Sequence, residues 1–142
     1  MSKSHRLRRV GGVTQFERAV EAKDIEGMTA ALAPDVVFRS PVVYRPYEGR
    51  NAVAKVLEAV THVFEEFEYA QRFEDDGGAA LIFRAKVGDR EIDGLDLLRL
   101  DDDGLVSELT VMVRPMSGLN ALATAMAEQL ERMGVPVPGG AS

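Results

Sequence analysis

The residue best placed to do chemistry in this chain is Asp96, because its sequence neighbours favour burial. Residues 90–100 alternate with the two-residue period of a β-strand, so Asp96 should share one face with Ile92 and Leu98. A carboxylate on such a face is costly unless it is paired, hydrogen-bonded or neutralised. Two interpretations remain open: a structural carboxylate with a nearby partner, or an acid that faces a ligand. Because its strand neighbours are apolar and no obligatory cation shares this face, we expect desolvation to raise its pKa, so that Asp96 is at least partly protonated near neutral pH.

Two hydroxyl groups complete the set of candidate catalytic residues. Ser40 is interpreted as a cavity hydroxyl, because a nucleophilic serine needs a base beside it. The loop 41–49 contains Tyr44 and Tyr47, an unusual aromatic content for a connection. These tyrosines either pack the loop over a cavity or donate a hydrogen bond to a ligand. The candidates are therefore Asp96, Ser40 and Tyr44.

No pattern in the chain is typical of a metal or cofactor site. His5 lies in the basic N-terminal segment, and His62 lies off the apolar stripe of its helix, where we expect it to be solvated. The chain has no cysteine, which excludes disulfides and thiolate ligands. The histidines and carboxylates are not spaced as metal ligands, and no glycine-rich phosphate loop is present. We expect no metal and no cofactor.

The composition limits domain number and partners. A length of 142 residues predicts one domain, over 13–134, between a flexible basic arm 1–12 and a flexible tail 135–142. The net charge of −6 argues against broad nucleic-acid binding. No apolar run approaches the ~18 residues of a membrane span, and no apolar segment follows the basic start. We therefore expect no membrane contact and a cytoplasmic location.

The elements that must position these groups follow the order helices, strand, helix and then several strands. Helices are expected to begin after Thr14, Asp24, Asn51 and Ser117. Strands are expected at 36–38, 68–75, 81–87, 90–100 and 105–114. The apolar stripe of the third helix extends to Phe64 and Phe67. The stripe of the last helix either packs on the core or closes it as a lid. This order predicts an α+β fold, with a curved, mostly antiparallel sheet around the N-terminal helices and an extra C-terminal helix.

Four stretches of the chain are similar to one known family: Phe16–Met28, Leu32–Phe38, Ser40–Gly49 and Asp96–Gly104. They resemble the nuclear-transport-factor-2-like superfamily, which includes SnoaL-like polyketide cyclases and ketosteroid isomerases. The resemblance covers roughly 100 residues and implies a cone-shaped α+β barrel whose cavity opens at Asp96. It says little about activity, because this scaffold hosts enzymes and non-enzymes alike.

The same resemblance implies an incomplete catalytic set. The general base of the isomerases falls on Ser40, and their oxyanion-hole tyrosine falls on Phe16. The tyrosine that supports it falls on Leu57. Only the second oxyanion-hole acid is kept, as Asp96, in an apolar setting of the kind that keeps a carboxyl neutral. The aspartate that the cyclases carry on their last strand has no counterpart in 108–114.

Two functions therefore remain open. The first is a SnoaL-like protein that binds a small apolar ligand and lacks the standard catalytic set. The alternative is an isomerase- or cyclase-type enzyme in which Asp96 transfers a proton on a polycyclic or terpenoid substrate, while Ser40 or Tyr44 stabilises the oxygen that gains charge. In both cases the expected pocket lining is Phe16, Phe38, Val56, Val60, Phe83, Leu98, Leu109, Val111 and Val113.

The strands expected at 90–100 and 105–114 form a hairpin, and the outer face of this hairpin predicts a partner. Leu95 and Leu97 alternate with the inward-facing residues of the first strand, and Thr110 and Met112 do the same on the return strand. A lone subunit would expose these side chains, and contiguous apolar patches usually mark an interface. We expect a homodimer through the face that carries Leu95, Leu97, Thr110 and Met112.

Overall fold

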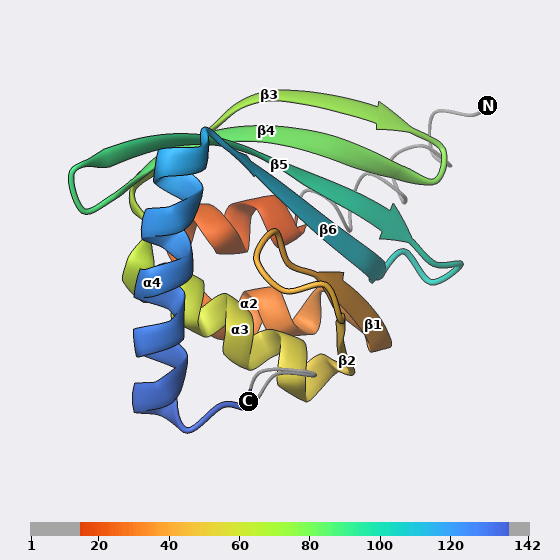
Figure 1. Cartoon of the computed structure of the whole chain (residues 1–142). Helices are drawn as coiled ribbons and strands as arrows, with labels where there is room; N and C mark the ends of the chain where they lie inside the picture. The colour runs from red at the N-terminus through yellow and green to blue at the C-terminus, as the bar shows by residue number, and fades with distance from the viewer. Residues whose placement is uncertain (1–14, 137–142) are drawn as a thin grey trace.

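The computed structural model describes residues 15–136 (Figure 1). The expected arm, Thr14 and the tail beyond residue 136 lie outside this part of the chain. A helix over residues 15–22 begins the fold. The remaining elements are α2 (Ile25–Ala30), β1 (Leu32–Arg39), β2 (Tyr47–Glu48), α3 (Arg50–Val63), β3 (Glu65–Asp75), β4 (Gly78–Val87), β5 (Arg90–Leu100), β6 (Val106–Arg114) and α4 (Met116–Met133).

The six strands form one curved sheet in the order β2-β1-β6-β5-β4-β3. Every neighbouring pair is antiparallel except β1 and β6, which run parallel. The sheet arches over the helices, which lie on its concave side, and α4 stands across one end (Figure 1). The expected α+β fold with a C-terminal helix is therefore confirmed. No helix in residues 15–136 is long and apolar enough to cross a membrane.

The border between the third helix and the next strand differs from the prediction. Phe64 is already extended at the end of α3, and Phe67 lies on β3, which starts at Glu65. Pairing of β3 with β4 overrides the helical spacing of these two aromatics. Both rings still reach the core, because their centroids lie 5.6 and 5.1 Å from that of Phe83.

Two further boundaries and the facing of one side chain differ from the prediction. The first strand begins at Leu32 and includes Pro34, which occupies an irregularity in the β1–β6 pairing where no ladder hydrogen bond is needed. Helix α4 starts at Met116, one residue before the serine expected to cap it. Val106 has the strand parity of Thr110 and Met112, which were expected on the outer face, yet it is fully buried. The register of β5 and β6 shifts after Arg99, and this bulge turns Val106 inward.

The concave face of β5 is shaped by a glycine. Gly94 lies opposite Phe83 on β4, and a Cβ atom at this position would overlap the Phe83 ring. The absence of a side chain lets Phe83 lie flat against the sheet beside Phe64 and Phe67. This aromatic group forms part of the cavity wall described below.

We predict that Gly94→Ala lowers the free energy of unfolding by about 1–3 kcal/mol, because Phe83 must leave its position in a packed core. Urea denaturation measures the change. Gly77→Ala is the matched control, since a Cβ atom there meets nothing closer than 3.9 Å. A Gly94→Ala protein as stable as Gly77→Ala would contradict this account of the packing.

Candidate functional site

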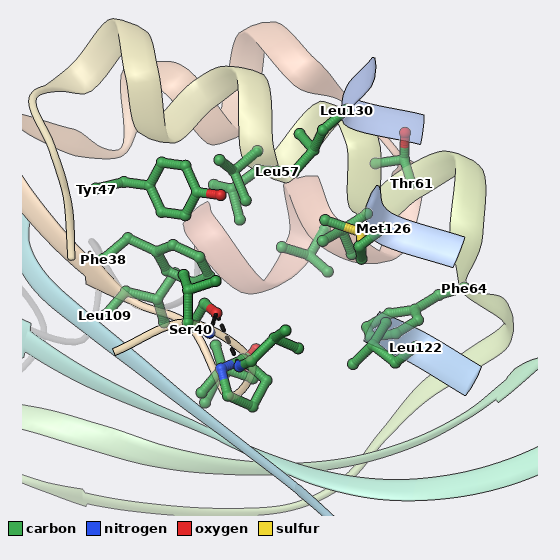
Figure 2. Close-up of a pocket in the computed structure, with 18 of the residues that line it drawn as sticks. Phe38, Ser40, Tyr47, Leu57, Thr61, Phe64, Leu109, Leu122, Met126 and Leu130 are labelled. Carbon is green, nitrogen blue, oxygen red and sulfur yellow. Dashed lines mark hydrogen bonds between the residues drawn. The ribbon is translucent and has the colours of Figure 1, made fainter. Parts of the chain in front are cut away.

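A cavity of about 240 Å³ lies between the concave face of the sheet and the helices. Residues from helix 15–22, α2, α3 and α4 form one side, and residues from all six strands and the β1–β2 loop form the other. The lining is almost entirely apolar (Figure 2). Four polar side chains are the exceptions: Ser40, Tyr47, Thr61 and Asp96.

The structure brings most of the sequence-predicted residues to this cavity. Asp96 and Ser40 both line it. The expected apolar residues in the lining are Phe16, Phe38, Val56, Val60, Phe83, Leu109 and Val111.

Three sequence-predicted residues lie elsewhere. Tyr44 is 99% exposed on its loop and is not part of the cavity wall. Leu98 shares the concave face but packs inside the core beside the cavity. Val113 packs in a second apolar cluster between the sheet and α4.

Helix α4 supplies lining residues that the sequence analysis did not assign to the pocket. Leu122, Met126 and Leu130 follow one another along its inner face and line the cavity. Figure 2 shows them opposite Phe38 and Tyr47. Their helical spacing was the available signal, since it left both core packing and closure of a cavity as alternatives.

Asp96 is the only charged residue in the buried set of residues 15–136, with 8% of its surface exposed. It lies between Leu81 on β4 and Val111 on β6. The hydroxyl of Tyr69 donates a hydrogen bond to its Oδ2 atom over 2.7 Å. No protein partner for Oδ1 and no cation paired with the carboxyl is found in residues 15–136. Tyr69 therefore holds Oδ2 in place, while Oδ1 is available for a hydrogen bond with a molecule in the cavity.

Burial controls the protonation of this pair. It raises the pKa of Asp96 from 3.8 to about 7, although the hydrogen bond from Tyr69 acts in the opposite direction. The pKa of Tyr69 lies well above 10, chiefly because of burial and then because of the neighbouring Asp96 charge. Near neutral pH Asp96 is thus present in both forms, while Tyr69 stays protonated. The expected rise of the Asp96 pKa is confirmed.

Ser40 lines the cavity but holds the loop that follows it. Its Oγ atom accepts hydrogen bonds from the backbone amides of Val42 (2.9 Å) and Val43 (3.0 Å), drawn as dashed lines in Figure 2. Its acceptor positions are therefore occupied, and within residues 15–136 no imidazole lines the cavity to activate it. Thr61 is likewise occupied, because its hydroxyl donates to the backbone oxygen of Glu58 over 2.6 Å.

The Asp96 pKa predicts a pH dependence of stability. The folded pKa exceeds the unfolded value, so the folded chain holds an extra proton between about pH 4 and pH 7. The free energy of unfolding should fall as the pH rises through this window and level off above it. The rise from 3.8 to about 7 corresponds to on the order of 4 kcal/mol.

Asp96→Asn should remove this contribution to the pH dependence of the free energy of unfolding. Urea titrations of both proteins at several values between about pH 4 and pH 7 measure the difference. The stability of the wild type relative to the variant should decline with rising pH. A constant difference between the two proteins would show that Asp96 ionises in the folded state as it does in water.

Comparisons with known proteins fit this architecture. Residues 13–109 match the family model described as the SnoaL-like domain. A steroid Δ-isomerase from Pseudomonas aeruginosa is 38% identical, with a TM-score of 0.85 over 89% of this chain and 93% of that one. A protein with a cystatin-like fold from Silicibacter pomeroyi is 34% identical, with a TM-score of 0.82 over 84% and 85% of the two chains.

A de novo designed protein with a curved β-sheet is 15% identical, with a TM-score of 0.70 over 87% of this chain and 97% of the design. At that identity the similarity concerns the fold alone. No curated protein matches the chain. The family match and the two relatives above 30% identity agree with each other and with the curved sheet. The chain belongs to the SnoaL-like domain family, within the nuclear-transport-factor-2-like superfamily.

Proposed function

We propose that this protein binds an apolar small molecule in the cavity, with one oxygen of that molecule hydrogen-bonded to Asp96. The observation that carries the proposal is a single buried carboxyl in an apolar wall, held by Tyr69 through one oxygen only. When Asp96 is neutral, it can donate from the other oxygen to a ketone or hydroxyl of the ligand. Apolar walls with a few convergent polar groups are typical of small-molecule sites.

The residues around Asp96 favour binding over the isomerase reaction of the superfamily. The base position is Ser40, whose oxygen is occupied by two loop amides. The tyrosine positions are Phe16 and Leu57, which have no hydroxyl. In a proton shift beside a ketone, one group removes the proton while another stabilises the charge on oxygen. Asp96 alone can fill only one of these roles at a time.

A second candidate function is an isomerase- or cyclase-type enzyme, and the Asp96 pKa of about 7 favours it. A general acid or base works best with a pKa near the working pH. Asp96 would remove a proton beside a ketone of a polycyclic or terpenoid substrate and return it to another carbon, while Tyr69 positions the carboxyl. The 38% identity to the steroid Δ-isomerase from Pseudomonas aeruginosa also supports testing a steroid substrate.

The binding proposal predicts a loss of affinity in Asp96→Leu. We expect the variant to bind para-hydroxybiphenyl about tenfold more weakly, because one hydrogen bond to the carboxyl is lost. Biphenyl itself, which has no oxygen, should bind both proteins alike. Equilibrium dialysis measures all four affinities. Equal affinity of wild type and variant for the hydroxylated compound would contradict the role of Asp96.

The enzyme candidate predicts turnover that Asp96→Asn removes. The substrate is a β,γ-unsaturated ketosteroid, whose conversion to the conjugated isomer is followed by absorbance. Loss of the acid–base group should lower kcat by at least roughly 100-fold, because the amide cannot accept the proton. If the wild type binds the steroid but does not convert it, the enzyme candidate is wrong and only the binding function remains.

We also propose that the convex face of the sheet joins two copies of the chain. This face carries a band of apolar and small side chains, called the convex patch: Ala80, Ile82, Leu95, Leu97, Thr110 and Met112. Leu97 is 44% exposed and Met112 is 52% exposed in the single chain. Contact with a second sheet would remove this apolar surface from water.

The charges at the two ends of the convex patch favour a second copy as the partner. On β5, Asp93 lies at one end and Arg99 at the other; on β6, Arg114 and Glu108 do the same. A twofold axis in the plane of the interface, perpendicular to the strands, would reverse one sheet relative to the other. Asp93 of each copy would then face Arg99 of the other, and Arg114 would face Glu108. The face is therefore complementary to itself.

This arrangement predicts that Leu97→Glu gives a monomer or an unstable chain, because the new charge would be desolvated twice in a symmetric interface. Lys55→Glu, at an exposed position of α3, is the charge-changing control and should leave the assembly unchanged. Sedimentation at micromolar concentration measures both. A monomeric wild type together with a folded Leu97→Glu protein of unaltered stability would rule out the dimer.

A further inference from the structure

Tyr47 has a buried hydroxyl with no protein partner in residues 15–136. It lies on the two-residue strand β2, opposite Phe38, and the two ring centroids are 5.9 Å apart. Only 6% of Tyr47 is exposed. Figure 2 shows its hydroxyl directed away from the backbone of β2, toward Leu57 and the interior of the pocket. A buried hydroxyl without a hydrogen bond is unfavourable, so a phenylalanine would serve the packing better.

The other three polar side chains of the cavity each make at least one hydrogen bond within the protein. Thr61 donates to a backbone oxygen of its own helix, and Ser40 accepts from the loop that it begins. Asp96 accepts from Tyr69. Burial raises the pKa of Tyr47, so its hydroxyl stays protonated and can donate or accept a hydrogen bond. Among the polar lining residues of 15–136, Tyr47 is thus the one that makes no side-chain hydrogen bond to the protein, and its hydroxyl, like Oδ1 of Asp96, is left for something in the cavity.

Tyr47 and Asp96 approach the cavity from well-separated strands. In the sheet order, β2 is three strand spacings from β5. At about 4.8 Å per spacing, their backbones are roughly 14 Å apart along the curved sheet before the side chains extend inward. The wall between them is formed by Phe38, Leu109 and Val111. The two polar groups therefore lie at different ends of an apolar surface.

We infer that Tyr47 is a second polar contact for the ligand, and that the ligand is an elongated apolar molecule with a hydrogen-bonding oxygen near each end. One oxygen meets Asp96 and the other meets the Tyr47 hydroxyl, with the apolar body against the wall between them. This inference rests on the proposed binding function and names the class of molecule that the cavity takes: a diol, a keto-alcohol or a diketone on a rigid hydrocarbon frame.

The test uses para-hydroxybiphenyl and para,para′-dihydroxybiphenyl, which share one rigid frame and differ by a hydroxyl at the far end. The wild type should bind the dihydroxy compound more tightly than the monohydroxy compound. Tyr47→Phe should weaken binding of the dihydroxy compound by roughly three- to tenfold, as expected for one neutral hydrogen bond. The same variant should change the affinity for the monohydroxy compound less than twofold, since its hydroxyl can bind at Asp96.

Tyr44→Phe is the matched control, because it removes the same atom from a fully exposed residue of the loop that leads into β2. It should leave both affinities unchanged. The ratio of the two affinities is measured within each protein, so a loss of stability in Tyr47→Phe would not imitate the result.

The outcomes separate this inference from the proposed function. If Asp96→Leu weakens both ligands while Tyr47→Phe leaves the ratio of affinities unchanged, the binding function stands and the role of Tyr47 is wrong. If the wild type binds neither compound, the ligand class is wrong and the inference falls with it. A ratio that drops in Tyr47→Phe and stays unchanged in Tyr44→Phe supports the second contact.

Discussion

The hydrogen bond from Tyr69 to Asp96 is the interaction on which the site depends. It joins β3 to β5 across β4 and fixes one carboxyl oxygen against the wall of an apolar cavity. Without this donor, a carboxyl so deeply buried would have no protein partner in residues 15–136 in either protonation state. The ring of Tyr69 also meets Phe67 edge-on, at 4.8 Å between centroids. The same side chain therefore stabilises the aromatic wall and orients the acid.

The sequence was informative where the period of an element decides the outcome. Alternation along residues 90–100 was sufficient to place Asp96 on the buried face and to foresee its raised pKa. It could not identify Tyr69, because two irregularities in the β3–β4 register determine which side chain of β3 reaches the carboxyl. Loop 41–49 shows the same limit. Tyr44 and Tyr47 are equivalent by composition, and only the short pairing of β2 with β1 turns Tyr47 inward. Such tertiary choices leave no periodic signal in one sequence.

Membership of the SnoaL-like family accounts for the fold, while the side chains of this chain determine the chemistry of the cavity. By the resemblance to the ketosteroid isomerases, the positions expected to carry a base and two tyrosines hold Ser40, Phe16 and Leu57. The first of these supports a loop, and the other two build apolar surface. Helix α4 then closes the cavity with aliphatic side chains from a part of the chain beyond the family match. The combination is a largely apolar cavity with few polar groups, one of which is an acid of near-neutral pKa.

The central claim is that Asp96 is held in an apolar site by Tyr69, and a direct titration of its carboxyl carbon by NMR tests it. The resonance can be assigned by its absence in Asp96→Asn. We expect a midpoint near pH 7 in the wild type. The midpoint should be higher in Tyr69→Phe, because the hydrogen bond from Tyr69 favours the ionised form. A midpoint near 4, the value of a solvated aspartate, or one that does not move in Tyr69→Phe, would contradict the account.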